Sequence, residues 1–299
     1  MKEGLVLNLG TQANKKLDTA LLLAAGTGSR LYPITQNAPK CLTLVKGISI
    51  LERMITNLRI NGFRRLIIVT GYLDSHIRDF LGDHSGDIKI EYIFSPLYKT
   101  TNNIYSLWMA REVIKEPFLL LESDLVFDET LLAEMLYPDR IAVAKMQPWM
   151  NGTSVTVNPS QKVKAFWANN ADSLGGAKYK TVNIYSLSLK SWNKIIKLLN
   201  RRISEGKVND YYETIFAEMI ADGSLNLSMV SFDDKPWYEI DTIDDLAEAE
   251  KLFALNSHFS EKKISVLKTN FKIPIIEAMP APPKEPGVLK IAETIQDPI

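Results

Sequence analysis

Short apolar segments alternate with amphipathic stretches along the first half of the chain. Four segments have the length and apolar content of strands, namely Ala20–Leu23, Arg64–Gly71, Ile88–Phe94 and Pro117–Leu121. Between them, apolar residues recur at helical spacing in Ile48–Asn61, in Leu73–Leu81, and from Asn102 or Asn103 to about Ile114. Strands and helices that alternate in this way predict a parallel sheet with helices on both faces.

From Ile141 onward the pattern changes to shorter β-type segments separated by Asn, Gly and Ser. These segments are Ile141–Lys145, Thr153–Val157, Val163–Trp167 and Tyr179–Tyr185. They predict a smaller antiparallel part of the sheet that faces the substrate. Later elements are helices at Lys190–Ile203 and Tyr211–Ala221, a strand at Leu225–Ser231, an extended segment at Tyr238–Asp241, and a final helix. The expected fold class is α/β, with a mostly parallel central sheet and an antiparallel subsheet.

The final helix has a polar start. Asp241 or Thr242 is expected to cap it, and Asp244 and Asp245 lie in its first turn. Two carboxylates in a first turn complement the helix dipole, and we assign them no other role.

The domain organisation follows from shifts in composition. We expect residues 1–18 to form an N-terminal extension, residues 19–256 the catalytic domain, and residues 257–299 a proline-rich tail or linker. The tail contains KIPIIEAMPAPPKEPG, in which the prolines oppose regular structure. Such a linker suits a fused or neighbouring enzyme of the same pathway.

Charge and targeting patterns narrow the class of protein. Lys and Arg balance Asp and Glu at 35 each, so the sequence predicts no nucleic-acid partner. We find no apolar run long enough to cross a bilayer and no signal-peptide core, so we expect no membrane insertion and a cytoplasmic location. The single cysteine, Cys41, is interpreted as a small buried residue.

Small residues directly follow the first strand. They are Ala24, Ala25, Gly26, Thr27, Gly28 and Ser29. A loop without bulky side chains lets backbone N–H groups close on a polyphosphate. Arg30 follows at once, and Lys40 follows Pro39 ten residues later, so two cations can neutralise a triphosphate and the charge that develops on its cleavage.

Two acidic residues stand where the strand Pro117–Leu121 ends. Asp124 lies between two apolar runs, where an unpaired charge would be costly, and an oxygen-ligated Mg²⁺ would remove that cost. The sequence leaves open whether Glu122 is also a metal ligand or only a residue at the end of the strand. Asp128 is interpreted as a helix cap because D-E-T-L-L is typical of a helix start.

The full string L-x-A-A-G-x-G-x-R-L-x-P-x-T-x-x-x-P-K, together with TNNIYSLW at 101–108, ESD at 122–124 and YEID at 238–241, resembles a known family. It is similar to the bacterial CTP:phosphocholine and 2-aminoethylphosphonate cytidylyltransferases of the sugar-phosphate nucleotidyltransferase-like superfamily. The resemblance covers about residues 19 to 255. It implies a Rossmann-like nucleotidyltransferase fold.

The resemblance also implies roles for individual residues. Asp124 and Asp241 would hold Mg²⁺, Arg30 and Lys40 would be the signature cations, and the base would lie over the Ala24–Gly26 backbone, with Asn103 also on the nucleotide. The family usually has D-x-D where this chain has E-S-D. The implied reaction is attack of a phosphate or phosphonate oxygen on the α-phosphorus of CTP, with release of pyrophosphate.

The acceptor would be a small phosphate or phosphonate, and its binding residues are expected among Trp149, Tyr185, Trp237, Tyr238 and Glu239. A trimethylammonium group favours aromatic faces. A primary ammonium would instead favour carboxylates such as Glu239, Asp233 and Asp234. The residues leave both acceptors open, together with two alternatives: a sugar-1-phosphate nucleotidylyltransferase and a non-catalytic nucleotide-binding module. A homodimer is a further possibility.

Overall fold

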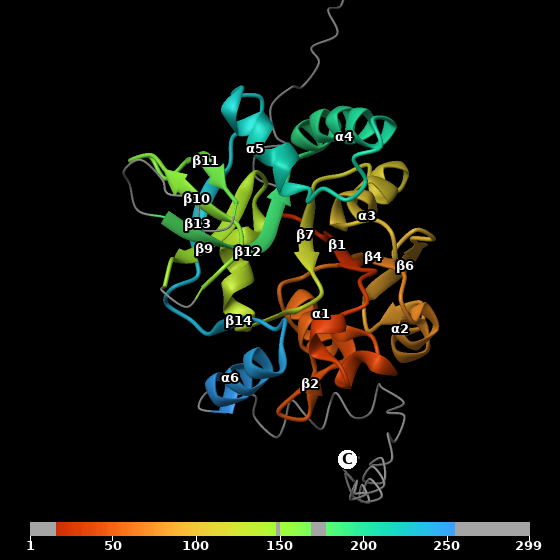
Figure 1. The fold of residues 1–299 in the computed structure, drawn as a ribbon. Coiled ribbons are helices and arrows are strands. Elements are labelled where there is room, and N and C mark those ends of the chain that lie inside the picture. Colours follow the sequence, from red (N-terminus) through yellow and green to blue (C-terminus); the bar gives the residue numbers. More distant parts are fainter. Residues whose placement is uncertain (1–15, 148–149, 169–177, 255–299) are drawn as a thin grey trace, which may run out of the picture.

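The computed structural model describes residues 16–147, 150–168 and 178–254 (Figure 1). Most of the expected N-terminal extension, the whole expected tail and the acceptor candidate Trp149 lie outside these ranges. The domain boundaries therefore stay predictions.

One ten-stranded sheet runs through the molecule in the order β11-β10-β12-β7-β1-β4-β6-β5, with β9 paired to β12 and β13 paired to β9. Its strands are β1 (Thr19–Ala24), β4 (Arg65–Thr70), β5 (His84–Ser85), β6 (Ile88–Phe94), β7 (Phe118–Glu122), β9 (Arg140–Lys145), β10 (Ser154–Val157), β11 (Val163–Trp167), β12 (Lys178–Leu187) and β13 (Ser228–Ser231). Two small antiparallel sheets pair β2 (Leu44–Val45) with β3 (Ile48–Ser49) and β8 (Leu125–Phe127) with β14 (Trp237–Glu239).

The centre of the sheet is parallel, as predicted. Strand β1 pairs in parallel with β4 on one side and β7 on the other, and β4 pairs in parallel with β6. The carboxyl ends of β1, β4 and β7 therefore meet at one edge of the sheet. Ligands of open α/β sheets bind at that edge.

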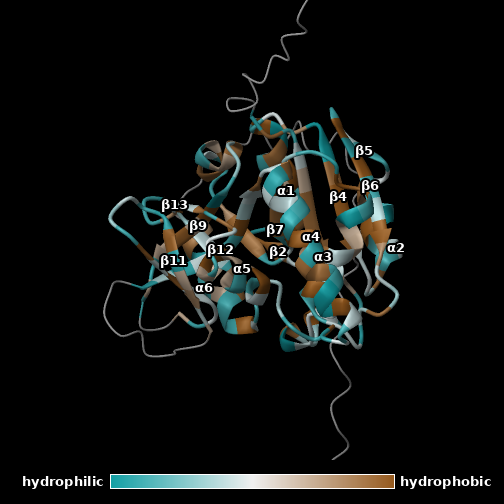
Figure 2. Cartoon of the chain, turned by 90° about the horizontal axis from the view of Figure 1, so that it is seen from above, coloured by the Kyte–Doolittle hydropathy of each residue, from teal (hydrophilic) through white to brown (hydrophobic). Residues whose placement is uncertain are grey.

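Helices cover both faces of this parallel region. They are α1 (Ile50–Ile60), α2 (Asp74–Leu81), α3 (Asn103–Met109), α4 (Leu189–Ser204) and α5 (Glu213–Ala221). The last helix, α6 (Ile243–Ala254), packs instead against β2 and β14. Alternate β1 residues point to opposite faces: Leu22 packs in one core with α1 and α2, whereas Leu21 and Leu23 pack in a second core with α3, α4 and α5. In Figure 2 the central strands are mainly hydrophobic, whereas α1 carries both colours.

The second half of the chain continues the same sheet. The long strand β12 pairs antiparallel with β7 through Ile184–Leu187, with β10 through Lys178–Lys180, and with β9 along both its first and its second half, so it joins the two parts. Strand β13 is parallel to β9, a detail that the expected antiparallel pattern does not include. The chain passes through α4 and α5 before β13, and a long crossover of this kind permits a parallel pairing.

One predicted helix ends earlier than expected, and two predicted helix starts agree with the structure. The helix expected to reach Ile114 is α only as far as Met109 and then tightens into a 3₁₀ turn at Ala110–Glu112, a common change at helix ends. Of the two candidate caps, Asn102 is the one whose side chain accepts the N–H of Asn103. Asp128 caps the 3₁₀ segment Glu129–Leu136, as predicted, by accepting the N–H of Thr130.

Candidate active site

The small-residue loop after β1 folds tightly onto Lys40. Gly28 has φ of 63°, in the left-handed region, and a Cβ there would come within 3.0 Å of the Lys40 Cβ. The carbonyl of Gly28 accepts a hydrogen bond of 2.7 Å from Thr35 Oγ1. A glycine at this position is therefore what allows the loop and Lys40 to approach each other.

A cavity of about 310 Å³ opens above this loop at the carboxyl edge of the sheet. Its lining includes the predicted nucleotide residues Ala25, Gly26, Thr27, Gly28, Ser29, Arg30 and Asn103, and also Lys40, Asp124 and Asp241. Ala24 does not line it, because this residue packs in the core that contains Leu22 and residues of α1 and α2. Tyr98, Thr101, Asn102, Ser106 and Tyr211 complete much of the wall, and sequence analysis did not assign any of them to nucleotide binding.

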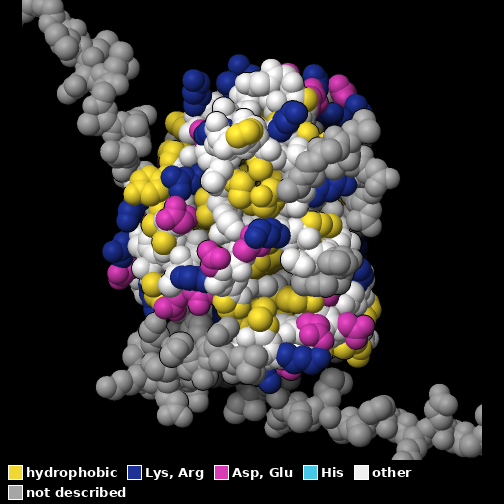
Figure 3. Space-filling model, turned by 90° about the vertical axis from the view of Figure 1, so that its left-hand side faces the viewer, with side chains coloured by type: hydrophobic (Ala, Val, Ile, Leu, Met, Phe, Trp, Pro, Cys, Tyr) yellow, Lys and Arg dark blue, Asp and Glu magenta, His cyan; other side chains and the backbone are white. Residues whose placement is uncertain are grey.

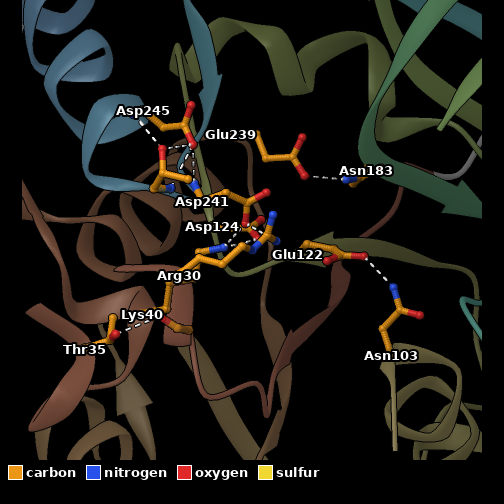
Figure 4. Close-up of polar contacts among 12 residues, drawn as sticks. Arg30, Thr35, Lys40, Asn103, Glu122, Asp124, Asn183, Glu239, Asp241 and Asp245 are labelled. Carbon is orange, nitrogen blue, oxygen red and sulfur yellow. Dashed lines mark hydrogen bonds and ion pairs between the residues drawn. The ribbon is translucent and has the colours of Figure 1, made fainter. Parts of the chain in front are cut away.

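Lys40 joins the two carboxylates that the sequence predicts as metal ligands (Figure 4). Its Nζ lies 2.7 Å from Asp124 Oδ2 and 2.6 Å from Asp241 Oδ1. Arg30 also reaches Asp241 Oδ1, at 2.8 Å. The structure thus brings four of the predicted site residues into one contact network.

Backbone pairing explains how Asp241 reaches Asp124. Strand β14 runs antiparallel to β8, with Glu239 opposite Leu125. One residue further on, the N–H of Ile240 donates to the carbonyl of Asp124 at 2.9 Å. The segment YEID is therefore held beside the end of β7, so both carboxylates face Lys40.

The charges in this network stabilise one another. Burial would lower the pKa of Lys40, but the negative charges of Asp124 and Asp241 and the hydrogen bonds to them outweigh it and raise the pKa. Burial opposes ionisation of Asp241, yet Lys40 and Arg30 together lower the pKa of that carboxyl. Lys40 is therefore an ammonium, and Asp241 a carboxylate, at neutral pH.

Arg30 differs from Lys40 in exposure. The Arg30 side chain is 69% exposed, whereas that of Lys40 is 14% exposed. An exposed ion pair contributes little to folding stability. Arg30 is accordingly free to exchange Asp241 for an anionic ligand in the cavity at small cost.

The two aspartates fit the oxygen ligands that Mg²⁺ prefers. Asp124 Oδ1 is buried without a hydrogen-bond partner, so it retains full capacity to coordinate a cation. Within the described ranges no group of three or more His, Cys, Asp or Glu residues has metal-binding geometry. Mg²⁺ commonly takes only one or two carboxylates and completes its shell with substrate phosphates and water. The donor set therefore fits a magnesium ion that binds together with a nucleotide.

Asp245 has a role that sequence analysis missed. Its Oδ2 accepts hydrogen bonds from the backbone N–H of Asp241 (3.1 Å) and from the N–H and hydroxyl of Thr242 (both 2.8 Å). Thr242 Oγ1 in turn accepts the N–H of Asp245 at 3.2 Å. Thr242 is thus the cap of α6, in a reciprocal capping arrangement that also holds the backbone of Asp241. The spacing T-x-x-D at 242–245 is typical of a helix start, so the sequence contained the pattern that predicts this arrangement.

Next to the aspartates lies a partly buried acidic cluster, which we define as Glu122, Glu213 and Glu239. Glu122 Oε1 accepts hydrogen bonds from Asn103 Nδ2 (3.0 Å) and from the Tyr212 hydroxyl (2.9 Å). Glu239 accepts from Asn183 Nδ2 at 3.1 Å and pairs with Lys180 at 3.0 Å. Glu213 lies at the start of α5 and is 7% exposed.

Burial dominates the ionisation of this acidic cluster. It raises the pKa of Glu122, whose carboxylate also feels the charges of Asp124 and Glu213. It likewise raises the pKa of Glu213, to about 7. Burial raises the pKa of Glu239 as well, although Lys180 opposes the shift. Each carboxyl of the cluster therefore holds its proton to a higher pH than a surface glutamate does.

A second cavity, of about 1240 Å³, adjoins the first and shares Arg30 and Asp241 with it. The acceptor candidates Trp237, Tyr238 and Glu239 line it. Tyr185 lines neither cavity, because its ring is fully buried against Tyr212 and Phe216.

Cys41 is buried, as predicted. On the face drawn in Figure 3, acidic and basic side chains are interspersed, in keeping with the balanced charge of the chain.

Comparison with known proteins finds similar nucleotidyltransferases. Residues 19–164 match the family described as nucleotidyl transferase. This part of the chain is therefore similar to nucleotidyl transferases. The prediction of a nucleotidyltransferase enzyme with an α/β fold of this type is thereby confirmed.

Three relatives of this nucleotidyl transferase illustrate the likeness. CMP-5'-(3-aminopropyl)phosphonate synthase from Streptomyces rubellomurinus is 30% identical over 246 residues, which cover 79% of this chain but only 38% of that protein. Choline-phosphate cytidylyltransferase from Streptococcus pneumoniae is 25% identical over 78% of this chain and 97% of its own. The solved CTP:phosphocholine cytidylyltransferase from Streptococcus pneumoniae has a TM-score of 0.70 and 22% identity, covering 79% of this chain and all of that one.

Among the described residues of this nucleotidyl transferase, no helix combines the length and apolar character needed to span a membrane.

Proposed function

We propose that this chain is a Mg²⁺-dependent cytidylyltransferase that joins CTP to a small amino-bearing phosphate or phosphonate and releases pyrophosphate. The observation that carries the proposal is the placement of Lys40 between Asp124 and Asp241 at the mouth of a glycine-lined cavity. Relatives named for cytidylyl transfer to phosphocholine and to an aminopropylphosphonate support the nucleotide and the acceptor class.

In this proposal the loop Ala25–Ser29 binds the triphosphate through its backbone N–H groups. Gly26 suits this role, because a Cβ there would meet no atom within 4 Å, so its backbone is open to the cavity. Arg30 moves from Asp241 to the β- and γ-phosphates. Asn103 and the walls of the 310 Å³ cavity hold the nucleoside.

The reaction is an in-line displacement. An anionic oxygen of the acceptor attacks the α-phosphorus, a new P–O bond forms, and the bond to the β-phosphate oxygen breaks, so that pyrophosphate leaves. The nucleophile is already an anion, so no strong general base is required, and positioning and charge neutralisation lower the barrier. Lys40 holds a fixed positive charge against the oxygens that gain negative charge in the transition state.

Asp124 and Asp241 would hold the magnesium ion. When bound, Mg²⁺ neutralises phosphate charge and orients the reacting oxygens. The product with a phosphate acceptor is a CDP derivative, and the product with a phosphonate acceptor is a CMP-phosphonate.

A pyrophosphate-release assay with Mg²⁺ tests the proposal. CTP is offered with phosphocholine, 2-aminoethylphosphonate or glucose 1-phosphate, and UTP and ATP replace CTP as nucleotide controls. We expect turnover with CTP and at least one amino-bearing acceptor. Turnover with glucose 1-phosphate alone would assign the chain to sugar activation, and no turnover with any acceptor would favour a non-catalytic nucleotide-binding module.

A further inference from the structure

One buried lysine lines the larger cavity. Lys180 lies on β12, its side chain is 6% exposed, and it forms part of the wall of the 1240 Å³ cavity. The other described cations of that wall are exposed to solvent: Arg30, Lys145, Lys235 and Lys251. Water and salt screen a buried charge much less than an exposed one. Lys180 is therefore the described cation of this wall that acts most strongly on an anion inside the cavity.

Two acceptors fix the ammonium group of Lys180. Its Nζ lies 3.0 Å from Glu239 Oε2 and donates to the carbonyl of Thr181 at 2.8 Å. Glu239 is held from its other oxygen as well, because Asn183 Nδ2 donates to Oε1 at 3.1 Å (Figure 4). An ammonium group has three N–H donors. Within the described residues, one donor of Lys180 therefore remains for a ligand in the cavity.

The backbone around Lys180 is irregular. The pairing of β12 with β9 shifts register between Thr181 and Tyr185, and Asn183 within this irregularity has φ of 59°, in the left-handed region. Irregularities of this kind redirect side chains and are common beside active sites. On the neighbouring loop, a Cβ at Gly152 would lie 3.4 Å from Lys180 Nζ. A glycine at this position therefore leaves room around the ammonium group.

Lys180 acts on the point where the two cavities meet. The 1240 Å³ cavity shares Arg30 and Asp241 with the cavity assigned to the nucleotide. Glu239, which pairs with Lys180, precedes Asp241 by two residues. Burial opposes ionisation of Asp241, but Lys40 and, more weakly, Lys180 lower the pKa of that carboxyl. The charge of Lys180 thus reaches the proposed reaction centre from the side of the larger cavity.

The proposed reaction needs a cation on this side. The attacking oxygen of the acceptor and the α-phosphate of the nucleotide are both negative, so they repel each other as they approach. In the proposed function Arg30 binds the β- and γ-phosphates, and Lys40 lies between the two metal ligands, so both serve the nucleotide. Lys180 is the buried cation that is left for the anionic end of the acceptor.

We propose that Lys180 binds the phosphonate or phosphate group of the acceptor and orients its attacking oxygen toward the α-phosphorus. This inference rests on the proposed cytidylyl transfer, since it concerns the acceptor of that reaction. Lys180 donates its remaining N–H to an oxygen that does not attack, so the attacking oxygen keeps its negative charge. Glu239 holds the ammonium group of Lys180 in position.

Lys180→Met is the first variant, because it keeps a long side chain and removes the charge. We expect KM to rise about 10- to 100-fold for the acceptor that the parent chain prefers, the range of one charge-assisted hydrogen bond. The rise should be equal for ethylphosphonate, which lacks an amine, and KM for CTP should change little. Lys164→Met, at an exposed position on β11, is the matched control and should leave all three values unchanged. An unchanged acceptor KM, or a rise confined to the amine-bearing acceptor, would overturn the inference.

A double-variant cycle separates acceptor binding from the ion pair with Glu239. Glu239→Gln removes the partner charge, and Lys180→Met/Glu239→Gln removes both, so the double variant has no unpaired charge at this pair. We expect the double variant to have a KM for ethylphosphonate about 10- to 100-fold above that of Glu239→Gln. Equal KM values in these two variants would mean that Lys180 only neutralises Glu239, and the inference would fail. The same comparison applies if Lys180→Met alone does not fold.

Calorimetry separates this inference from the proposed function. The phosphonates are titrated into the full chain with Mg²⁺ and a non-cleavable α,β-methylene analogue of CTP present. If the parent chain releases no pyrophosphate but loses phosphonate affinity in Lys180→Met, cytidylyl transfer fails and the role of Lys180 stands. If pyrophosphate is released but the parent chain and Lys180→Met bind phosphonates equally, cytidylyl transfer stands and the role of Lys180 is wrong. Absence of phosphonate binding by the parent chain would contradict the role as well.

Discussion

Lys40 Nζ lies 2.6 Å from Asp241 Oδ1, although 201 positions separate the two residues in the chain. The same nitrogen contacts Asp124, so one ammonium lies between two carboxylates that would otherwise repel each other, and Arg30 adds a second positive charge at Asp241. This contact connects the glycine loop to the two proposed metal ligands.

Substitution of Lys40 by Met should therefore remove a charge that acts in the transition state. We expect kcat to fall by more than about 100-fold with CTP and the preferred acceptor, as is typical for loss of one preorganised electrostatic group. Circular dichroism and gel filtration check that the fold persists. Lys197→Met, at an exposed position on α4, is the matched control and should leave kcat unchanged. A folded Lys40→Met enzyme with near-normal kcat would rule out the assigned role.

Magnesium should stabilise the folded chain through the same carboxylates. A ligand that binds only the native state raises stability by RT ln(1 + [L]/Kd), or about 3 kcal/mol at 100 times Kd. We expect Tm to rise on titration with MgCl₂ and CTP, and EDTA to abolish turnover. In Asp124→Asn the magnesium-dependent part of the Tm shift should largely disappear. An equal shift in that variant would place the metal elsewhere.

Glu213 should make stability depend on pH near neutrality. Its folded pKa is about 7, above the ordinary value of 4.5, because burial disfavours the charged form. Below pH 4.5 both folded and unfolded states hold the proton, whereas between pH 4.5 and 7 only the folded state does, so its contribution to stability falls as pH rises. The loss amounts to about 3 kcal/mol and is complete above pH 7.

Denaturation of Glu213→Gln across pH 4 to 8.5 tests whether the contribution of Glu213 to folding stability falls as the pH rises. Relative to the parent chain, the variant should gain stability as pH rises from 4.5 to 7 and then keep a constant advantage. A parallel pair of stability curves would contradict the raised pKa.

Asp245→Ala should loosen Asp241 as well as the start of α6. We expect a stability loss of about 1–2 kcal/mol from the lost cap and, because the Asp241 backbone is freed, a fall in kcat of about 10-fold. Asp128→Ala removes a comparable cap, at Thr130, without contact to Asp241. It should lower stability alone, and a kcat loss of the same size in both variants would argue against a positioning role for Asp245.

Local patterns were sufficient to predict the parallel sheet, the glycine loop and the helix cap at Asp128. The run Ala20–Leu23 is apolar at every position because helices cover both faces of β1. A strand that is buried on both faces can therefore be predicted from an uninterrupted apolar segment. The motif residues Gly28, Arg30 and Lys40 lie close together in the chain, so their proximity in space needed only a short loop.

Long-range pairing determined the rest. Asp241 reaches Asp124 only because β14 pairs with β8, and no local pattern records which strand a three-residue segment will choose. The acidic cluster likewise joins residues from the end of β7, the start of α5 and β14, and no pattern within any one of these segments shows that the three side chains lie together. Burial and mutual repulsion of charges depend on what packs against a residue, and packing exists only once the chain has folded.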